Sequence, residues 1–215
     1  MELDIFSDTI CPWCLIGKRR LERALAQRPQ PDLKIRWRAF QLNPDMPAAG
    51  MDRKLYLATK FGGPENASSV YDRIREAGAS EGIDFDFDGI GHTPNTVDSH
   101  RLIRFADRNG CQDAVVEGLF QAYFLNGRNI GDREVLVSIA AANGLNAEAT
   151  ENYLATTEDA DAIRAEDAQA RAVGINGVPC FIFNGRHALP GAQSPEVFFQ
   201  LFDLAREETK SPVTV

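Results

Sequence analysis

The sequence contains little cysteine and histidine, no long apolar run and no excess of basic residues. Four cysteines in 215 residues are too few for a disulfide scaffold. The three histidines have no ligand-like spacing to each other or to the cysteines, which argues against a metal site. No stretch approaches the roughly 18 apolar residues of a membrane-spanning helix. With 23 basic and 31 acidic residues and a net charge of −8, we expect neither nucleic acid nor a membrane as a main partner.

The first residues, Met1-Glu2-Leu3-Asp4, are acidic where a secretory signal peptide would be basic. We therefore expect a cytoplasmic protein, in which a pair of cysteines is more typical of catalysis than of structural cross-linking. The hydrophobic content of 44% and charged content of 25% are typical of a globular protein. The length accommodates one domain, or one domain with a large insertion.

The main motif is Cys11-Pro12-Trp13-Cys14. A strand is predicted over residues 3–8 and a helix over residues 15–27, so the motif begins a helix directly after a strand. The free N–H groups and partial positive charge at a helix start favour the thiolate form of Cys11. Pro12 suits the first helical turn. Cys14, one turn further on, is expected to be shielded and to resolve a mixed disulfide formed at Cys11.

A Cys-x-x-Cys motif can also supply half of a zinc site, but such a site needs two further ligands at comparable spacing. The sequence offers no second pair of this kind. We therefore interpret Cys11 and Cys14 as a redox pair and predict no metal.

The order of predicted elements indicates an α/β fold. Alternation over residues 33–40 predicts a second strand, parallel to the first through a right-handed crossover. Residues 178–183 predict a third strand, and Asn184-Gly185 predicts a hairpin to a fourth over residues 186–189. A last helix is expected to begin at Ser194-Pro195. The two ends give βαβ and ββα units and a four-stranded mixed sheet.

The middle of the chain has helical periodicity without strand alternation. We predict an all-helical insertion over residues 51–157, and a sheet domain formed by residues 1–50 and 158–215.

Several segments, in this order, match one known family. They are residues 7–19 (SDTICPWCLIGKR), 94–96 (PNT), 100–102 (HRL), 119–124 (LFQAYF), 174–179 (GINGVP) and 191–193 (GAQ). The chain resembles the thioredoxin fold, more narrowly the DsbA-like family with a helical insertion, and within it the cytosolic FrnE-like oxidoreductases. The resemblance extends over nearly the whole chain.

This resemblance implies a thiol–disulfide oxidoreductase acting on protein or small-molecule disulfides and dithiols. It implies that Pro179 is cis and stands opposite the cysteine pair, with Val178 offering its backbone to an extended substrate. The alternative from the residues alone is that Pro179 ends a loop before an edge strand. Pro12 and Trp13 are expected to line the substrate site, Trp13 as a hydrophobic lip. No bound cofactor is implied, glutathione is a candidate co-substrate, and the family suggests a homodimer.

Cys180 departs from the family pattern, which has a large apolar residue after the proline. We interpret it as a buried core thiol, the alternative being a third sulfur within reach of the active pair. Cys111 is expected at a helix start far from the chemistry. His92, His100 and His187 are interpreted as solvated or capping histidines.

Two other functions remain open. Kappa-class glutathione transferases and 2-hydroxychromene-2-carboxylate isomerases share the fold and the insertion, but carry Ser at the nucleophile position and no second cysteine. A chaperone or binding module would use the same groove without its cysteines. An oxidoreductase requires both Cys11 and Cys14, a glutathione enzyme is expected to tolerate Cys14→Ser, and a binding module is expected to tolerate both changes.

Overall fold

The computed structural model describes residues 1–210, apart from the side chains of residues 64, 65 and 208–210. Its main sheet has the strand order β2-β1-β5-β6. The strands are β1 Glu2–Ser7, β2 Lys34–Ala39, β5 Cys180–Phe183 and β6 His187–Pro190. β2 is parallel to β1, whereas β5 is antiparallel to both β1 and β6. The predicted four-stranded mixed sheet is confirmed.

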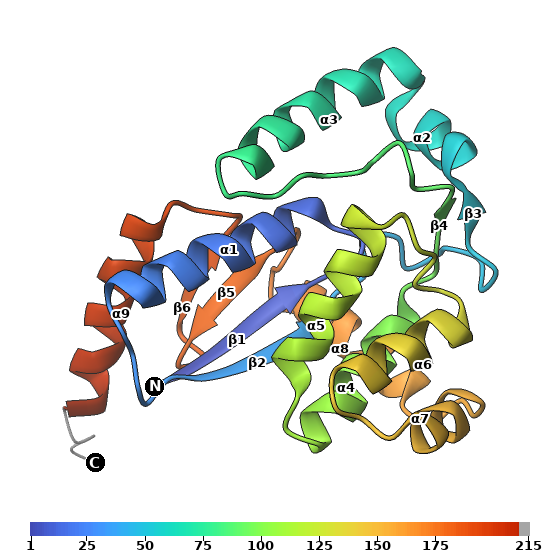
Figure 1. Cartoon of the computed structure of the whole chain (residues 1–215). Helices are drawn as coiled ribbons and strands as arrows, with labels where there is room; N and C mark the ends of the chain where they lie inside the picture. The colour runs from blue at the N-terminus through green and yellow to red at the C-terminus, as the bar shows by residue number, and fades with distance from the viewer. Residues whose placement is uncertain (211–215) are drawn as a thin grey trace.

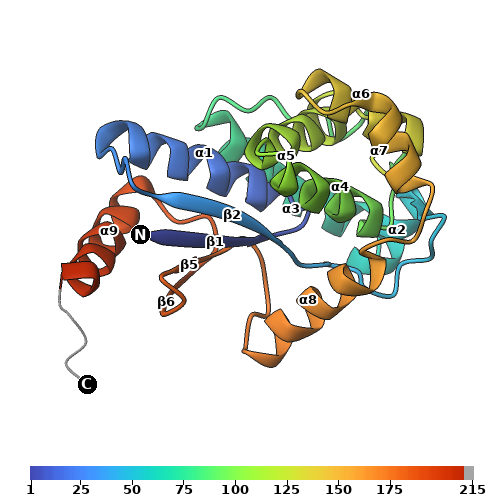
Figure 2. The ribbon, with the colours of Figure 1, turned by 90° about the horizontal axis from the view of Figure 1, so that it is seen from below.

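The two faces of the sheet are covered by different helices. α1 (Pro12–Gln27) and α9 (Pro195–Lys210) pack on one face, and α8 (Ala160–Ala172) covers the other (Figures 1 and 2). Side chains alternate accordingly along β5. Phe181 and Phe183 make ring contacts with α9, whereas Cys180 packs in a separate cluster with Ala170 of α8.

The turn between β5 and β6 forms as its sequence predicts. Asn184 and Gly185 have φ values of 49° and 67°, as a tight hairpin turn requires. Asn184 also accepts a hydrogen bond from the Glu2 backbone and donates one to Ala205 O. The hairpin is thus joined to β1 and α9.

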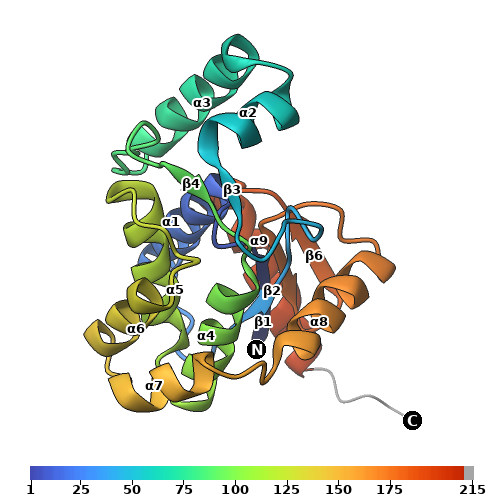
Figure 3. The same cartoon turned by 90° about the vertical axis from the view of Figure 1, so that its right-hand side faces the viewer.

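The middle of the chain contains most of the remaining helices. They are α2 Arg53–Phe61, α3 Pro64–Ala79, α4 Val97–Arg108, α5 Gln112–Phe120, α6 Arg133–Ala142 and α7 Ala147–Leu154. A π-helical turn, η1 (Gln121–Leu125), continues α5. The α2–α3 hairpin stands above α1, apart from α4–α7 (Figures 1 and 3).

The prediction of a middle region without strands is wrong in one place. β3 (Met51–Asp52) pairs antiparallel with β4 (His92–Thr93). This two-stranded ladder joins the two ends of the chain segment that contains α2 and α3. Two residues per strand are too few to produce an alternation that a sequence pattern can reveal.

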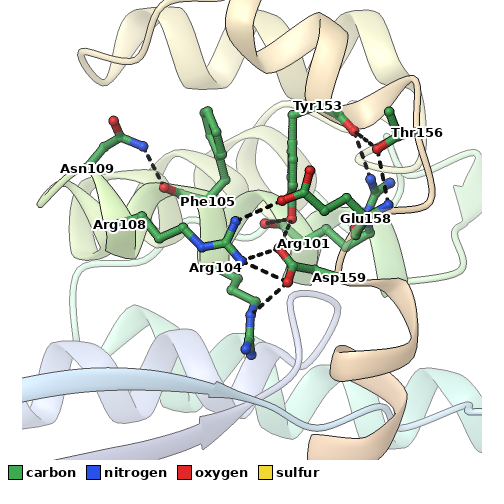
Figure 4. A network of polar contacts seen from close by, with 9 residues as sticks. All are labelled: Arg101, Arg104, Phe105, Arg108, Asn109, Tyr153, Thr156, Glu158 and Asp159. Atoms are coloured by element: carbon green, nitrogen blue, oxygen red, sulfur yellow. Dashed lines mark hydrogen bonds and ion pairs between the residues drawn. The ribbon is translucent and has the colours of Figure 1, made fainter.

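A polar network fixes α4 to the segment between α7 and α8 (Figure 4). Arg101 is 2% exposed, and it donates hydrogen bonds to Glu158 O at 2.6 Å and Tyr153 O at 2.9 Å. Asp159 accepts from the Tyr153 hydroxyl and from Arg108. Asp159 itself has a φ of 63°, which an Asp tolerates better than most residues.

Candidate functional site

The two cysteines lie where β1 passes into α1. Cys11 is the N-cap residue of α1, and Pro12 occupies the first helical position. The turn is closed by backbone hydrogen bonds from Cys11 N to Asp8 O and from Cys14 N to Cys11 O, both 3.0 Å long. Both thiols are free. Cys11 is 4% and Cys14 1% exposed, whereas Trp13 between them is 37% exposed.

Burial raises the pKa of the Cys14 thiol well above its ordinary value. Its contact with Cys11 raises that pKa further, while hydrogen bonds from Ser7 and the Asp8 backbone act in the opposite direction. Cys14 is thus held as a protonated thiol beneath Cys11 at neutral pH.

Val178 and Pro179 lie against the cysteine pair. The peptide bond between them is cis, and the Cys11 thiol donates a hydrogen bond to Val178 O at 3.5 Å. Pro179 O accepts from Gly191 N at 2.7 Å, which fixes the loop before β5. The sequence segments around residues 11–14 and 178–179 therefore meet at one place in the fold.

Gly17 permits this close approach. A Cβ at Gly17 would lie 2.9 Å from Pro179 Cγ and 3.2 Å from Phe181 Cζ. At these distances the side chains of Pro179 and Phe181 would have to shift. The glycine is thus needed for packing between α1 and the Pro179 loop.

We expect Gly17→Val to destabilise the fold by about 1–3 kcal/mol because the added side chain overpacks this contact. Chemical denaturation measures the change in the free energy of unfolding. Gly177→Ala is a suitable control, since a Cβ there meets no atom within 4 Å and the expected change is below about 0.5 kcal/mol. Equal stability of the two variants would contradict the packing role of Gly17.

A buried pair of polar side chains next to the motif was not foreseen. The Asp8 side chain is fully buried, and its Oδ2 accepts from Leu42 N at 2.7 Å. Its Oδ1 lies 3.4 Å from His100 Nε2 of α4, and neither of these two atoms has a hydrogen-bond partner among the residues described. The interpretation of His100 as solvated or capping is wrong, because α4 presents this side chain, 3% exposed, to the turn that precedes Cys11. The sequence did offer one indication of this pair, an acidic residue, Asp8, three residues before Cys11.

Charged side chains of α1 bind the helix to α5. Lys18, 4% exposed in its side chain, lies 3.3 Å from Glu117 and 3.2 Å from Asp113. Arg19 donates to both oxygens of Glu117. Burial alone would raise the pKa of Glu117, but hydrogen bonds from Arg19 and Gln121 and the charge of Lys18 lower it to about 2. Glu117 thus stays ionised and holds α1 against α5.

The other two cysteines have surroundings that differ from those of the pair. Cys180 belongs to the small cluster with Phe40, Ala170 and Ile175, whereas Cys11 and Cys14 belong to the main core. Burial raises the pKa of Cys180. Cys111 caps α5. Within the described part of the chain, no three His, Cys, Asp or Glu side chains come together in a way that could hold a metal ion. No helix among residues 1–210 is long and apolar enough to cross a membrane.

Comparison with known proteins agrees with this arrangement. The model of the DSBA-like thioredoxin domain matches residues 2–203. A crystal structure of a probable DsbA oxidoreductase from Streptomyces coelicolor is 32% identical, with a TM-score of 0.90, and the match covers 100% of this chain and 93% of that one. The uncharacterized protein YwbO of Bacillus subtilis is 26% identical over 199 residues, which are 92% of this chain and 94% of YwbO. The cytosolic disulfide reductase DsbM from Pseudomonas aeruginosa, determined with GSH, is 20% identical, with a TM-score of 0.68 and coverage of 96% and 100%. The last of these likenesses concerns the fold alone.

Proposed function

The chain belongs to the DSBA-like thioredoxin domain family, and from this premise we propose that it is a thiol–disulfide oxidoreductase whose electrons are carried by Cys11 and Cys14. The observation that carries the proposal is the meeting of two free thiols at the start of α1 with the backbone of Val178, 3.5 Å from Cys11 Sγ. A substrate disulfide that enters beside Val178 would meet Cys11 first.

The reaction then proceeds by two exchanges. The Cys11 thiolate attacks one sulfur of the substrate disulfide, a mixed disulfide forms, and the first substrate thiol leaves. Cys14 then attacks the Cys11 sulfur, which releases the second substrate thiol and leaves a Cys11–Cys14 disulfide. In the opposite direction the same pair oxidises a dithiol.

The surroundings of the two cysteines support these roles. The raised pKa of Cys14 keeps it protonated and out of the first attack. Trp13 is the exposed member of the motif, and with Pro12 it would form one side of the substrate site. Val178 and Pro179 would hold the partner chain on the other side.

The remaining parts of the proposal concern partners and location. Since the electrons reside on sulfur, the reaction needs no bound cofactor, and glutathione would serve as a co-substrate. We place the reaction in the cytoplasm, as in the protein named cytosolic disulfide reductase, and we propose that the chain forms a homodimer.

Redox titration tests the proposal. Wild type and Cys180→Ser are equilibrated in glutathione buffers, quenched with an alkylating reagent and weighed by mass spectrometry. We expect one two-electron transition confined to Cys11 and Cys14, the same in both proteins because Cys180 packs in a separate cluster.

Two outcomes would contradict this. A disulfide that includes Cys180 in wild type would make it a third member of the redox centre. A pair that never closes, together with non-covalent binding of glutathione, would favour the isomerase or transferase function.

A further inference from the structure

Arg53 is a buried cation without an acidic partner. It is the first residue of α2 and is 7% exposed. Its guanidinium donates to Thr93 Oγ1 at 3.2 Å and to the Tyr71 hydroxyl at 2.5 Å. Its Nε has no hydrogen-bond partner, and no carboxylate pairs with Arg53 among the side chains that the structure describes.

Burying an unpaired charge is costly, so a buried guanidinium normally has an anion beside it. The rings of Tyr56 and Tyr71, centred 5.5 and 5.3 Å from the guanidinium carbon, offset part of this cost through cation–π attraction. They leave the charge itself uncompensated.

Arg53 borders a pocket between α2 and α3 of about 450 Å³, which is in the size range of small-molecule sites. Among the side chains that the structure describes, three cationic ones, Arg53, Lys54 and Arg75, and one acidic one, Asp88, line the pocket. Asp88 is paired with Arg75 at 3.0 Å. This described lining is therefore positive in a protein whose net charge is −8.

The pocket is lined in part by α3, which runs above α1, the helix that begins at the cysteine pair (Figures 1 and 3). Tyr71 of α3 is one of the lining residues. Burial raises the pKa of Tyr71, Arg53 lowers it, and the nearby charge of a Cys11 thiolate raises it. Tyr71 thus accepts a hydrogen bond from the buried guanidinium and lies within electrostatic range of Cys11.

We propose that the pocket between α2 and α3 binds a carboxylate of the substrate, with Arg53 as its buried anchor and Lys54 at the exposed rim, so that the preferred substrates are disulfides and thiols carrying a carboxylate. This inference rests on the proposed function and adds the substrate class to it. Arg is suited to the role because its planar fork of donors matches a carboxylate.

The exchange with such a substrate balances without another reactant. The Cys11 thiolate attacks the sulfur of the acidic disulfide, and the leaving thiolate takes a proton from solvent. Cys14 then gives up its proton and attacks Cys11, and the second acidic thiol departs. Two electrons pass from the dithiol to the substrate disulfide, and the protein is left oxidised.

Single-turnover reduction tests the proposal. Reduced wild type is mixed with glutathione disulfide or with its tetraethyl ester, in which all carboxylates are neutral, and the formation of the Cys11–Cys14 disulfide is followed by quenching and mass spectrometry. We expect the acid to react about tenfold faster than the ester, from the strength of a hydrogen bond to a charged group. This ratio should fall as salt is added.

Variants show which side chains cause the preference for the acid over the ester. Arg53→Gln is expected to bring the acid-to-ester ratio to within about twofold, and Lys54→Gln to lower it partway, since an exposed charge contributes less. Arg164→Gln, on the exposed face of α8, is the matched control and should leave the ratio unchanged. The wild-type ratio and Lys54→Gln remain informative if Arg53→Gln fails to fold.

A second pair of substrates identifies the source of the carboxylate. The disulfides of acetyl-Glu-Cys-amide and acetyl-Gln-Cys-amide differ in one charge only. Discrimination within the peptide pair indicates an acidic residue beside the substrate cysteine, and discrimination confined to the glutathione pair indicates a free small thiol. Either result supports the proposal.

Equal rates for both pairs, unchanged in Arg53→Gln, would overturn the carboxylate site and leave the oxidoreductase standing. If reduced wild type closes its disulfide with none of the four substrates, the proposed function fails instead.

Discussion

Replacing Cys11 with Ser is expected to abolish disulfide exchange, with a rate loss of about a thousandfold or more. The attacking group is the thiolate, and the hydroxyl of Ser at the same place is not ionised at neutral pH. The measurement is single-turnover reduction of a small disulfide by the reduced protein. A Cys11→Ser variant that keeps more than a tenth of the wild-type rate would contradict the assignment of Cys11 as the nucleophile.

Replacing Cys14 with Ser is expected to stop the reaction one step later. Cys11 still attacks, but nothing resolves the mixed disulfide, so an adduct of protein and half-substrate accumulates and is detected by its mass. Cys111→Ser is the matched control, because Cys111 stands at the start of α5 and its thiol donates to Ala106 O, and it should form no such adduct. If Cys14→Ser turns over like wild type, the chain uses a single cysteine, as a glutathione-dependent enzyme would.

The features that could be predicted from the sequence are those with a strong local signal. The pattern of Leu3, Ile5 and Trp37 marks two strands of a buried sheet. Asn184-Gly185 specifies a hairpin because both residues tolerate positive φ. The Cys-x-x-Cys motif has chemical meaning once a strand precedes it and a helix follows. The contact of this motif with Val178, which is far away in sequence, could be predicted only from the family resemblance.

The features that were missed depend on long-range contacts between polar side chains. A sequence pattern places Lys18, Arg53, His100 and Arg101 on solvent-exposed faces, since charged and polar residues are rarely buried. All four are at most 7% exposed. Each is covered by another segment of the chain: Lys18 lies beside Glu117, Arg53 donates to Tyr71, His100 lies 3.4 Å from Asp8, and Arg101 donates to two backbone carbonyls. Local periodicity carries no information about such partners.

The burial of Arg101 leads to the second large expected effect. His100 and Arg101 are neighbours in one of the segments on which the family resemblance rests, yet they have different surroundings. His100 faces the turn before Cys11, while Arg101 faces the linker between α7 and α8 (Figure 4). α8 covers the sheet face opposite α1 (Figure 2), so Arg101 acts on the position of α8 rather than on the chemistry of the cysteines.

Arg101→Met is therefore expected to destabilise the protein by about 3–5 kcal/mol. Methionine keeps most of the apolar stem but removes the donor to Tyr153 O and Glu158 O and the cationic partner of Asp98. Tyr153 O keeps its hydrogen bond from Thr156, so the main cost is the loss of one member of a buried charged network. It also removes the stacking of the guanidinium over the Tyr153 ring, at 4.9 Å. Chemical denaturation compares it with Arg164→Met, a matched change at an exposed arginine of α8, for which we expect less than about 0.5 kcal/mol.

The same pair of variants shows whether Arg101 has a structural or a chemical role. Folded Arg101→Met is expected to close its Cys11–Cys14 disulfide at the wild-type rate, because the Arg101 side chain bonds to Glu158, Asp98 and Tyr153 rather than to the cysteine pair. A variant that is as stable as Arg164→Met would show that the carbonyls find other donors, and that Arg101 does not hold α4 to the α7–α8 linker. A stable variant with slowed disulfide closure would instead place Arg101 in the redox machinery, and the whole segment from His100 to Leu102 would then belong to the site.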